Sequence, residues 1–160
     1  MIYENYKDYS APERVQPIVA GLLGELAPKY LHGLQSVVLT NSVAVGKGKT
    51  MRVGGRRYPR RECRGFYHPK RSGEPPWIEL VVDNILAWSD AYTTAEQDYT
   101  ERALASVLFH EIGHHLDYTI GSPTRRGEIA ADAWRDRLIE EILRKRWARL
   151  GARREVSPLV

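Results

Sequence analysis

The chain has 160 residues and carries 24 lysines and arginines against 20 aspartates and glutamates, for a formal net charge of +4. This length suits one domain with a proper core, so we expect a single domain over residues 1–160. The single cysteine, Cys63, excludes an internal disulfide framework and is typical of a reducing cytoplasm. Residues 1–10 lack the apolar core of a signal peptide and no run approaches a membrane span. We therefore expect a cytoplasmic protein without a membrane partner.

The first element expected is a helix over residues 12–30. Apolar side chains recur there at helical spacing, from Val15 to Leu26, and Pro28 closes the pattern. Runs of β-branched and apolar residues predict strands at 34–40 and 50–53. His32 lies in a turn between helix and strand, and we do not expect it to bind a metal.

A basic block covers residues 47–71, where ten lysines and arginines accompany one acid, Glu62. Glycines at 46, 48, 54 and 55 favour a hairpin or loop. The block could contact nucleic acid or an acidic protein. It could also be a solvated loop that balances residues 72–101, which hold seven acids and no lysine or arginine. We favour the second interpretation, because few aromatic residues accompany the charges.

Two further strands are expected before the next helix. Phe66 and Tyr67 form a short one that His68-Pro69 ends. Residues 77–84 form the clearest strand of the chain, because buried and exposed positions alternate along it, with Ile78, Leu80 and Val82 on one face and Glu79, Val81 and Asp83 on the other.

Residues 94–118 are expected to form a long helix that carries His110-Glu111-Ile112-Gly113-His114. Thr94 and Gln97 form a capping box at its start. An apolar stripe at helical spacing anchors one side of the helix, made of Ala105, Leu108, Phe109, Ile112 and Leu116. His110 and His114 share the opposite face, as metal ligands four residues apart do. Glu111 lies about 100° round the helix, beside such a metal rather than bound to it.

A second helix, over residues 128–150, offers what the histidines lack. Glu128 and Asp132 are four residues apart and therefore share a face. If that face meets the first helix, Glu128 can be the third ligand that catalytic zinc usually takes. Asp132 can then accept a hydrogen bond from the second ring nitrogen of one histidine. The small Ala130 and Ala131 would let the two helices approach closely.

These residues resemble a known family. His110-Glu111-x-x-His114 followed by Glu128-x-x-x-Asp132 is similar to the gluzincin clan of zinc metallopeptidases, and in particular to the ImmA/IrrE-type peptidases. The resemblance is specific over residues 104–134 and architectural over 34–90. It implies one Zn²⁺ per chain, held by His110, His114 and Glu128.

The resemblance also implies a fold and a reaction. The fold is α+β and zincin-like, with a small mixed or antiparallel sheet packed on an N-terminal helix and on the motif helix, followed by a C-terminal helix that carries Glu128. The reaction is peptide-bond hydrolysis by a zinc-activated water, with Glu111 as general base. A peptide substrate would add as an extra strand to residues 77–84, expected at the edge of the sheet.

A second donor should stabilise the oxyanion of this reaction. Tyr118 is our candidate, and Tyr92, Tyr99 and His115 are the others. Asp117 shares the histidine face and is expected to make a polar contact there, or to be the third ligand if Glu128 is not.

Two alternatives stay open. One is an inactive zinc-stabilised binding module, and the other is a DNA-associated regulator that uses residues 47–71. Cys63 could cap the zinc in a latent form, although a lone thiol in a basic loop is more often incidental.

Overall fold

The structure is a computed structural model that describes residues 1–45, 50–53, 56–71, 73–90, 96–120 and 127–155. Within these ranges the protein is α+β, with a four-stranded mixed sheet, a separate two-stranded sheet and five α-helices. The helices are α1 (Val15–Glu25), α2 (Ser42–Val45), α3 (Val82–Asp90), α4 (Glu96–Ile120) and α5 (Gly127–Glu155). The strands are β1 (Ile2–Asn5), β2 (Ser36–Thr40), β3 (Thr50–Val53), β4 (Arg56–Pro59), β5 (Gly65–His68) and β6 (Trp77–Val81).

The main sheet has the strand order β1-β2-β6-β5. β2 pairs in parallel with both β1 and β6, and β5 pairs antiparallel with β6. The outer strands are therefore β1 and β5. The expected edge strand at residues 77–84 is wrong on two counts: β6 lies inside the sheet, and it ends at Val81.

The physical reason is visible at the end of β6. Val81, Val82 and Ile85 are all fully buried, so the alternation of inner and outer positions stops and a helical spacing begins. The Asp83 carboxylate accepts hydrogen bonds from the backbone N–H of Ser42 at 2.9 Å and from its hydroxyl at 2.6 Å. Residues 82–84 consequently open α3 and hold α2 in place.

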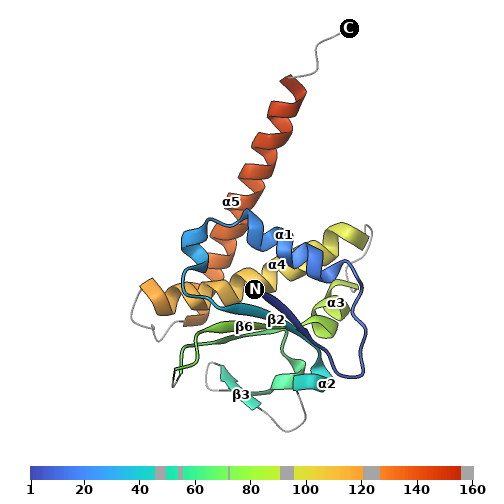
Figure 1. Cartoon of the computed structure of the whole chain (residues 1–160), viewed down its shortest axis with the longest axis vertical. Helices are drawn as coiled ribbons and strands as arrows, with labels where there is room; N and C mark the ends of the chain where they lie inside the picture. The colour runs from blue at the N-terminus through green and yellow to red at the C-terminus, as the bar shows by residue number, and fades with distance from the viewer. Residues whose placement is uncertain (46–49, 54–55, 72, 91–95, 121–126, 156–160) are drawn as a thin grey trace.

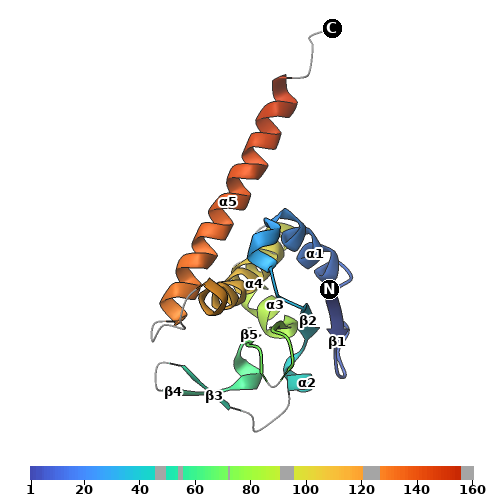
Figure 2. The same ribbon diagram turned by 60° about the vertical axis from the view of Figure 1, so that its left-hand side comes forward.

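The molecule is layered, as Figure 1 and Figure 2 show. α4 lies between the sheet and the N-terminal part of α5, and α1 packs beside α4. The apolar stripe expected on the motif helix is confirmed, since all five of its side chains are at most 9% exposed. The C-terminal part of α5 extends away from the rest of the molecule.

Several expected elements differ in extent. The helix expected over residues 12–30 is α1 followed by a separate 3₁₀ turn, η1 (Pro28–Leu31). The hairpin in the basic block is confirmed, since β3 and β4 pair antiparallel. The capping residue Thr94 lies outside the described residues. None of the described helices combines the length and apolar character needed to cross a membrane.

The packing face of α5 agrees with its apolar pattern in part. The pattern predicts a packing face made of Ile129, Ala133, Trp134, Leu138, Ile142 and Leu143. Leu138 and Ile142 are buried as expected, and the small Ala131 is buried with them. Ile129 and Leu143 are 65% and 48% exposed, so these two positions were wrong.

Candidate metal centre

Three side chains converge where the start of α5 crosses α4. His110 and His114 are one turn apart on α4, and their ring centroids lie 4.8 Å apart. Glu128, in the first turn of α5, places Oε2 3.4 Å from His110 Nε2 and Oε1 3.7 Å from His114 Nε2. One ligand atom from each of the three lies within 4.8 Å of the others. This group could hold a metal ion.

The donor set can be tested against zinc. Imidazole nitrogen and carboxylate oxygen ligands lie about 2.1 Å from zinc, so two ligand atoms of a tetrahedral site are roughly 3.4 Å apart. The separations from Glu128 to His110 and His114, 3.4 Å through Oε2 and 3.7 Å through Oε1, are close to that value, and one ligand atom from each of the three residues lies within 4.8 Å of the others. Both histidine side chains are about one-fifth exposed, which leaves room for a water or a substrate atom. The residues present fit the ion.

Asp132 holds His110 in the orientation that this site needs. Its Oδ1 lies 2.9 Å from His110 Nδ1 and accepts a second hydrogen bond from Arg135 Nη1 at 2.7 Å. A proton on Nδ1 satisfies this contact, and Nε2 then keeps its lone pair toward Glu128. The expected role of Asp132 is thus supported by its position. Arg135 is a partner that the sequence pattern did not indicate.

Glu111 is not one of the three converging side chains. It is 6% exposed, and the backbone N–H of Tyr67 in β5 donates a hydrogen bond to its carboxylate. Burial, and next the nearby charge of Glu128, raise the pKa of Glu111 to about 8, while the Tyr67 N–H acts in the opposite direction. A cation held by the neighbouring ligands would also lower this pKa. Glu111 is therefore a buried carboxyl group beside, and not within, the metal site.

Tyr67, whose backbone N–H bonds the Glu111 carboxylate, lies on β5, an outer strand of the main sheet. Val81 N–H donates to the Arg64 carbonyl at 2.7 Å, so in the antiparallel register Phe66 and His68 also bond β6. Gly65 and Tyr67 then direct their main-chain groups away from β6, as the Tyr67 contact with Glu111 indicates. The sheet edge beside the metal centre is consequently β5.

Glu111 and the three converging residues line a cleft of about 650 Å³. Tyr118 also lines it and is 47% exposed, with its ring centroid 5.6 Å from that of Tyr67. Asp117 is close enough to raise the pKa of His114, although burial and the His110 charge have larger effects and lower it. Asp117 is not part of the converging ligand set. The structure thus brings Tyr118 to the cleft and leaves Asp117 as a neighbour of the site.

His115 has a role that the sequence did not reveal. It is fully buried, with Nδ1 3.3 Å from the Tyr67 hydroxyl and Nε2 3.0 Å from the His32 carbonyl oxygen. Both ring nitrogens are therefore occupied, and His115 is not a free donor for an oxyanion. Its effect is to fix Tyr67, and through it β5, against α4. The alternation of side chains in the strand at Phe66 and Tyr67 could have indicated that Tyr67 faces the motif helix.

The other sequence candidates lie elsewhere. Tyr99 precedes His110 by eleven residues on α4, roughly 16 Å along the helix axis, and does not line the cleft. Tyr92 falls outside the described residues. Cys63 lines the cleft, but its thiol contacts the Pro59 carbonyl oxygen at 3.6 Å, and burial raises its pKa. Neither Cys63 nor His32 belongs to the group of converging ligand atoms found within the described residues.

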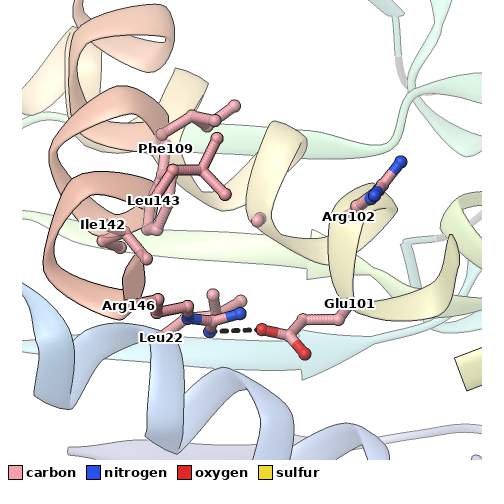
Figure 3. Close-up of a pocket in the computed structure, with 9 residues that line it drawn as sticks. Leu22, Glu101, Arg102, Phe109, Ile142, Leu143 and Arg146 are labelled. Carbon is pink, nitrogen blue, oxygen red and sulfur yellow. Dashed lines mark hydrogen bonds and ion pairs between the residues drawn. The ribbon is translucent and has the colours of Figure 1, made fainter. Parts of the chain in front are cut away.

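A second cavity, of about 540 Å³, lies between α1, α4 and α5 (Figure 3). Apolar side chains such as Phe109 and Ile142 line it, and an ion pair between Arg146 and Glu101 closes one side. Arg146 also contacts Glu25 of α1 at 2.8 Å. This ion-pair network ties α5 to the rest of the fold. The cavity brings together no set of metal-ligating side chains among the described residues.

Comparison of the chain with protein-family models, with curated proteins and with solved structures gave no match. The geometry of this cleft is therefore the evidence for function. It places a candidate cation site, a buried carboxyl group and an open strand edge within one cavity.

Proposed function

We propose that this protein is a zincin-like, zinc-dependent metallopeptidase with one zinc ion held by His110, His114 and Glu128. The observation that carries the proposal is the position of Glu111. A structural zinc site usually takes four protein ligands and needs no further acid, whereas a buried carboxyl group beside three ligands costs stability unless it has a use. General base chemistry at a metal-activated water is such a use.

Each residue then has a defined part in hydrolysis. A zinc ion at this site would polarise a peptide carbonyl and lower the pKa of water. Glu111 takes the proton of the attacking water and passes it to the leaving amine. The Tyr67 N–H keeps the Glu111 carboxylate directed into the cleft. Tyr118, on the same wall, is the candidate donor to the oxyanion.

We further propose that the substrate peptide pairs with β5 and not with residues 77–84. β6 has neighbours on both sides, so its main chain is not available. Among the described residues β5 has a neighbouring strand on one side only. Its other side borders the cleft and offers the outward main-chain groups of Gly65 and the carbonyl of Tyr67, whose N–H already bonds Glu111. Strand addition there would bring the peptide past Glu111.

The decisive experiment is Glu111→Gln. The amide keeps the size of the side chain and removes the base, and general acid–base catalysis contributes typically 10²–10⁴-fold. We expect peptide hydrolysis, followed by mass spectrometry of peptide libraries, to fall by about that factor. Zinc content, measured by elemental mass spectrometry, should stay at one per chain. Glu140→Gln is the matched control, since Glu140 is 70% exposed and pairs only with Arg144 among the described residues.

Other outcomes would contradict the proposal in different ways. A zinc-loaded wild type that is as inert as Glu111→Gln toward all peptides would indicate a zinc-stabilised binding module. Full hydrolysis in Glu111→Gln would exclude Glu111 as the base. Loss of zinc in the variant would place Glu111 among the ligands.

A further inference from the structure

The cleft has an unusual charge distribution outside the metal centre. Its lining includes three arginines, Arg64, Arg71 and Arg135. Apart from Glu111 and Glu128, the carboxylate that lines it is Glu62. Outside the metal centre, three arginines therefore line the cleft against one carboxylate.

Not all of these cations are available to a ligand. Arg135 already pairs with Asp132 at 2.7 Å and with Asp136 at 2.9 Å. Arg64 and Arg71 have no carboxylate partner within ion-pair distance among the described residues, and both are exposed. Arg60, from the same basic block, differs because it pairs with Glu79 at 3.2 Å. Arg64 and Arg71 therefore differ from Arg60 in the basic block, because they line the cleft without an ion-pair partner among the described residues.

Main-chain hydrogen bonds hold the backbone of both Arg64 and Arg71. The Arg64 carbonyl accepts the Val81 N–H at 2.7 Å, and the Arg64 guanidinium lies 4.4 Å from the centre of the Trp88 ring. Arg71 exchanges backbone hydrogen bonds with Glu74, at 2.7 and 3.2 Å, across a turn in which Gly73 has φ +91°. A glycine suits that backbone conformation. These contacts fix the backbone of both arginines beside the cleft.

Their places in the sequence put them on opposite sides of the reacting centre. Arg64 immediately precedes β5, and Arg71 follows its last residue by three. Glu111 contacts β5 between them, at Tyr67. An extended peptide on the free edge of β5 would therefore pass one arginine on each side of the bond beside Glu111.

We propose that the cleft selects peptides with acidic side chains on both sides of the bond to be cleaved, with Arg64 and Arg71 as the specificity-determining residues. This inference rests on the proposed peptidase function. Exposed ion pairs contribute about 0.2–1 kcal/mol, so each arginine should favour a glutamate over a glutamine by up to roughly fivefold. The preference should weaken as salt rises, because the charges are solvent-exposed.

The test uses zinc-loaded protein and a peptide series with a common central cleavable segment, in which the residues on each side are varied independently among glutamate, glutamine and lysine. The wild type should prefer glutamate over glutamine over lysine, mainly through KM. Arg64→Glu and Arg71→Glu should each reverse the preference on one side only, and on opposite sides. Arg64→Gln and Arg71→Gln should abolish it on that side without reversing it. The controls are Arg137→Glu and Arg57→Glu: Arg137 stacks on Trp134 at 5.0 Å, as Arg64 does on Trp88, and Arg57 is exposed outside the cleft lining.

Binding of the same peptides, labelled with a fluorophore, to zinc-loaded Glu111→Gln separates this inference from the peptidase proposal. Charge-dependent binding that both arginine variants reverse, without hydrolysis by the wild type, would support the cleft selectivity and reject the enzyme. Hydrolysis without charge preference would keep the enzyme and overturn the inference. Tighter binding of a single-stranded oligonucleotide, lost in both variants, would assign the arginines to nucleic acid instead and overturn it as well.

Discussion

A β-carbon on Gly113 of α4 would lie 2.6 Å from the carbonyl oxygen of Ala131 in α5 and 2.7 Å from its α-carbon. The two helix backbones therefore touch at this point. Gly113 immediately precedes His114, and Ala131 is three residues after Glu128. The contact consequently sets how close Glu128 comes to the two histidines.

We expect Gly113→Ala to separate the helices and weaken the metal site. Alanine improves helix propensity by about 1 kcal/mol, but insertion of a methyl group into a packed contact typically costs 1–3 kcal/mol. Because the clash is with backbone, relaxation by a side-chain rotation is not available. The free energy of unfolding should fall by up to roughly 2 kcal/mol in urea, and zinc affinity by at least about tenfold.

Gly21→Ala in α1 is the control for this change. A β-carbon there meets nothing within 4 Å, and the residue lies inside a helix. The variant should gain about 0.5–1 kcal/mol and keep its zinc affinity. Wild-type zinc affinity in Gly113→Ala would show that the helix contact does not position Glu128.

A second close approach concerns the proposed base. A β-carbon on Gly65 would lie 2.7 Å from Glu111 Oε1 and 2.8 Å from a methyl carbon of Val107. Gly65→Ala should therefore displace the Glu111 carboxylate and leave the metal ligands where they are. Misplacement by about 1 Å can cost 10²-fold in rate, so we expect a loss approaching that size in kcat with zinc content unchanged. Gly24→Ala, where a β-carbon meets nothing within 4 Å, should retain activity. Undiminished kcat in Gly65→Ala would mean that the carboxylate position is not critical.

The convergence of His110, His114 and Glu128 could be predicted from the sequence because most of its spacing is local. His110 and His114 share a helix face whatever the tertiary structure, and Glu128 and Asp132 do so on the next helix. Only one long-range assumption was needed, that the two faces meet. Gly113 and the small Ala131 gave a physical reason for it, and the observed contact agrees.

The strand order could not be predicted in the same way. β1 was missed because its residues are polar and mostly exposed, so no apolar alternation reveals it. Its pairing with β2 depends on main-chain hydrogen bonds between segments more than thirty residues apart. The edge position expected for residues 77–84 came from the family resemblance and not from the residues themselves, and the polar Glu79 of β6 is accommodated inside the sheet by Arg60 and His68, at 3.2 and 2.9 Å. Partners of that kind are set by the fold and leave no local periodicity.

The functions of Tyr67, His115 and Arg135 escaped prediction for a related reason. Each acts on the site through a contact with a residue far away in the sequence: Tyr67 with Glu111, His115 with Tyr67, and Arg135 through Asp132 on His110. A side chain type alone does not specify such a partner. The separations span more than twenty residues in the first two cases and in the contact of Asp132 with His110.

We expect the carboxylates around the candidate metal centre to differ in how much each contributes to zinc affinity. Glu128→Ala removes one of three ligand side chains, so zinc affinity, measured by competition with a chelator dye, should fall further than in any other variant of this group. Asp132→Ala keeps all three ligands but frees His110 Nδ1, and such a loss typically costs 10–100-fold in metal affinity. Asp117→Ala should have a smaller effect, because Asp117 is outside the converging ligand group and acts on His114 through its charge.

Asp136→Ala serves as the control for the aspartate changes. Asp136 is 69% exposed and contacts Arg135 on the side away from His110, so its removal should leave zinc affinity within about twofold of wild type. A loss in Asp117→Ala that exceeds the loss in Glu128→Ala would make Asp117 the third ligand. It would also mean that Glu128, at 3.4 and 3.7 Å from the two histidines, merely pairs with them when no metal is bound.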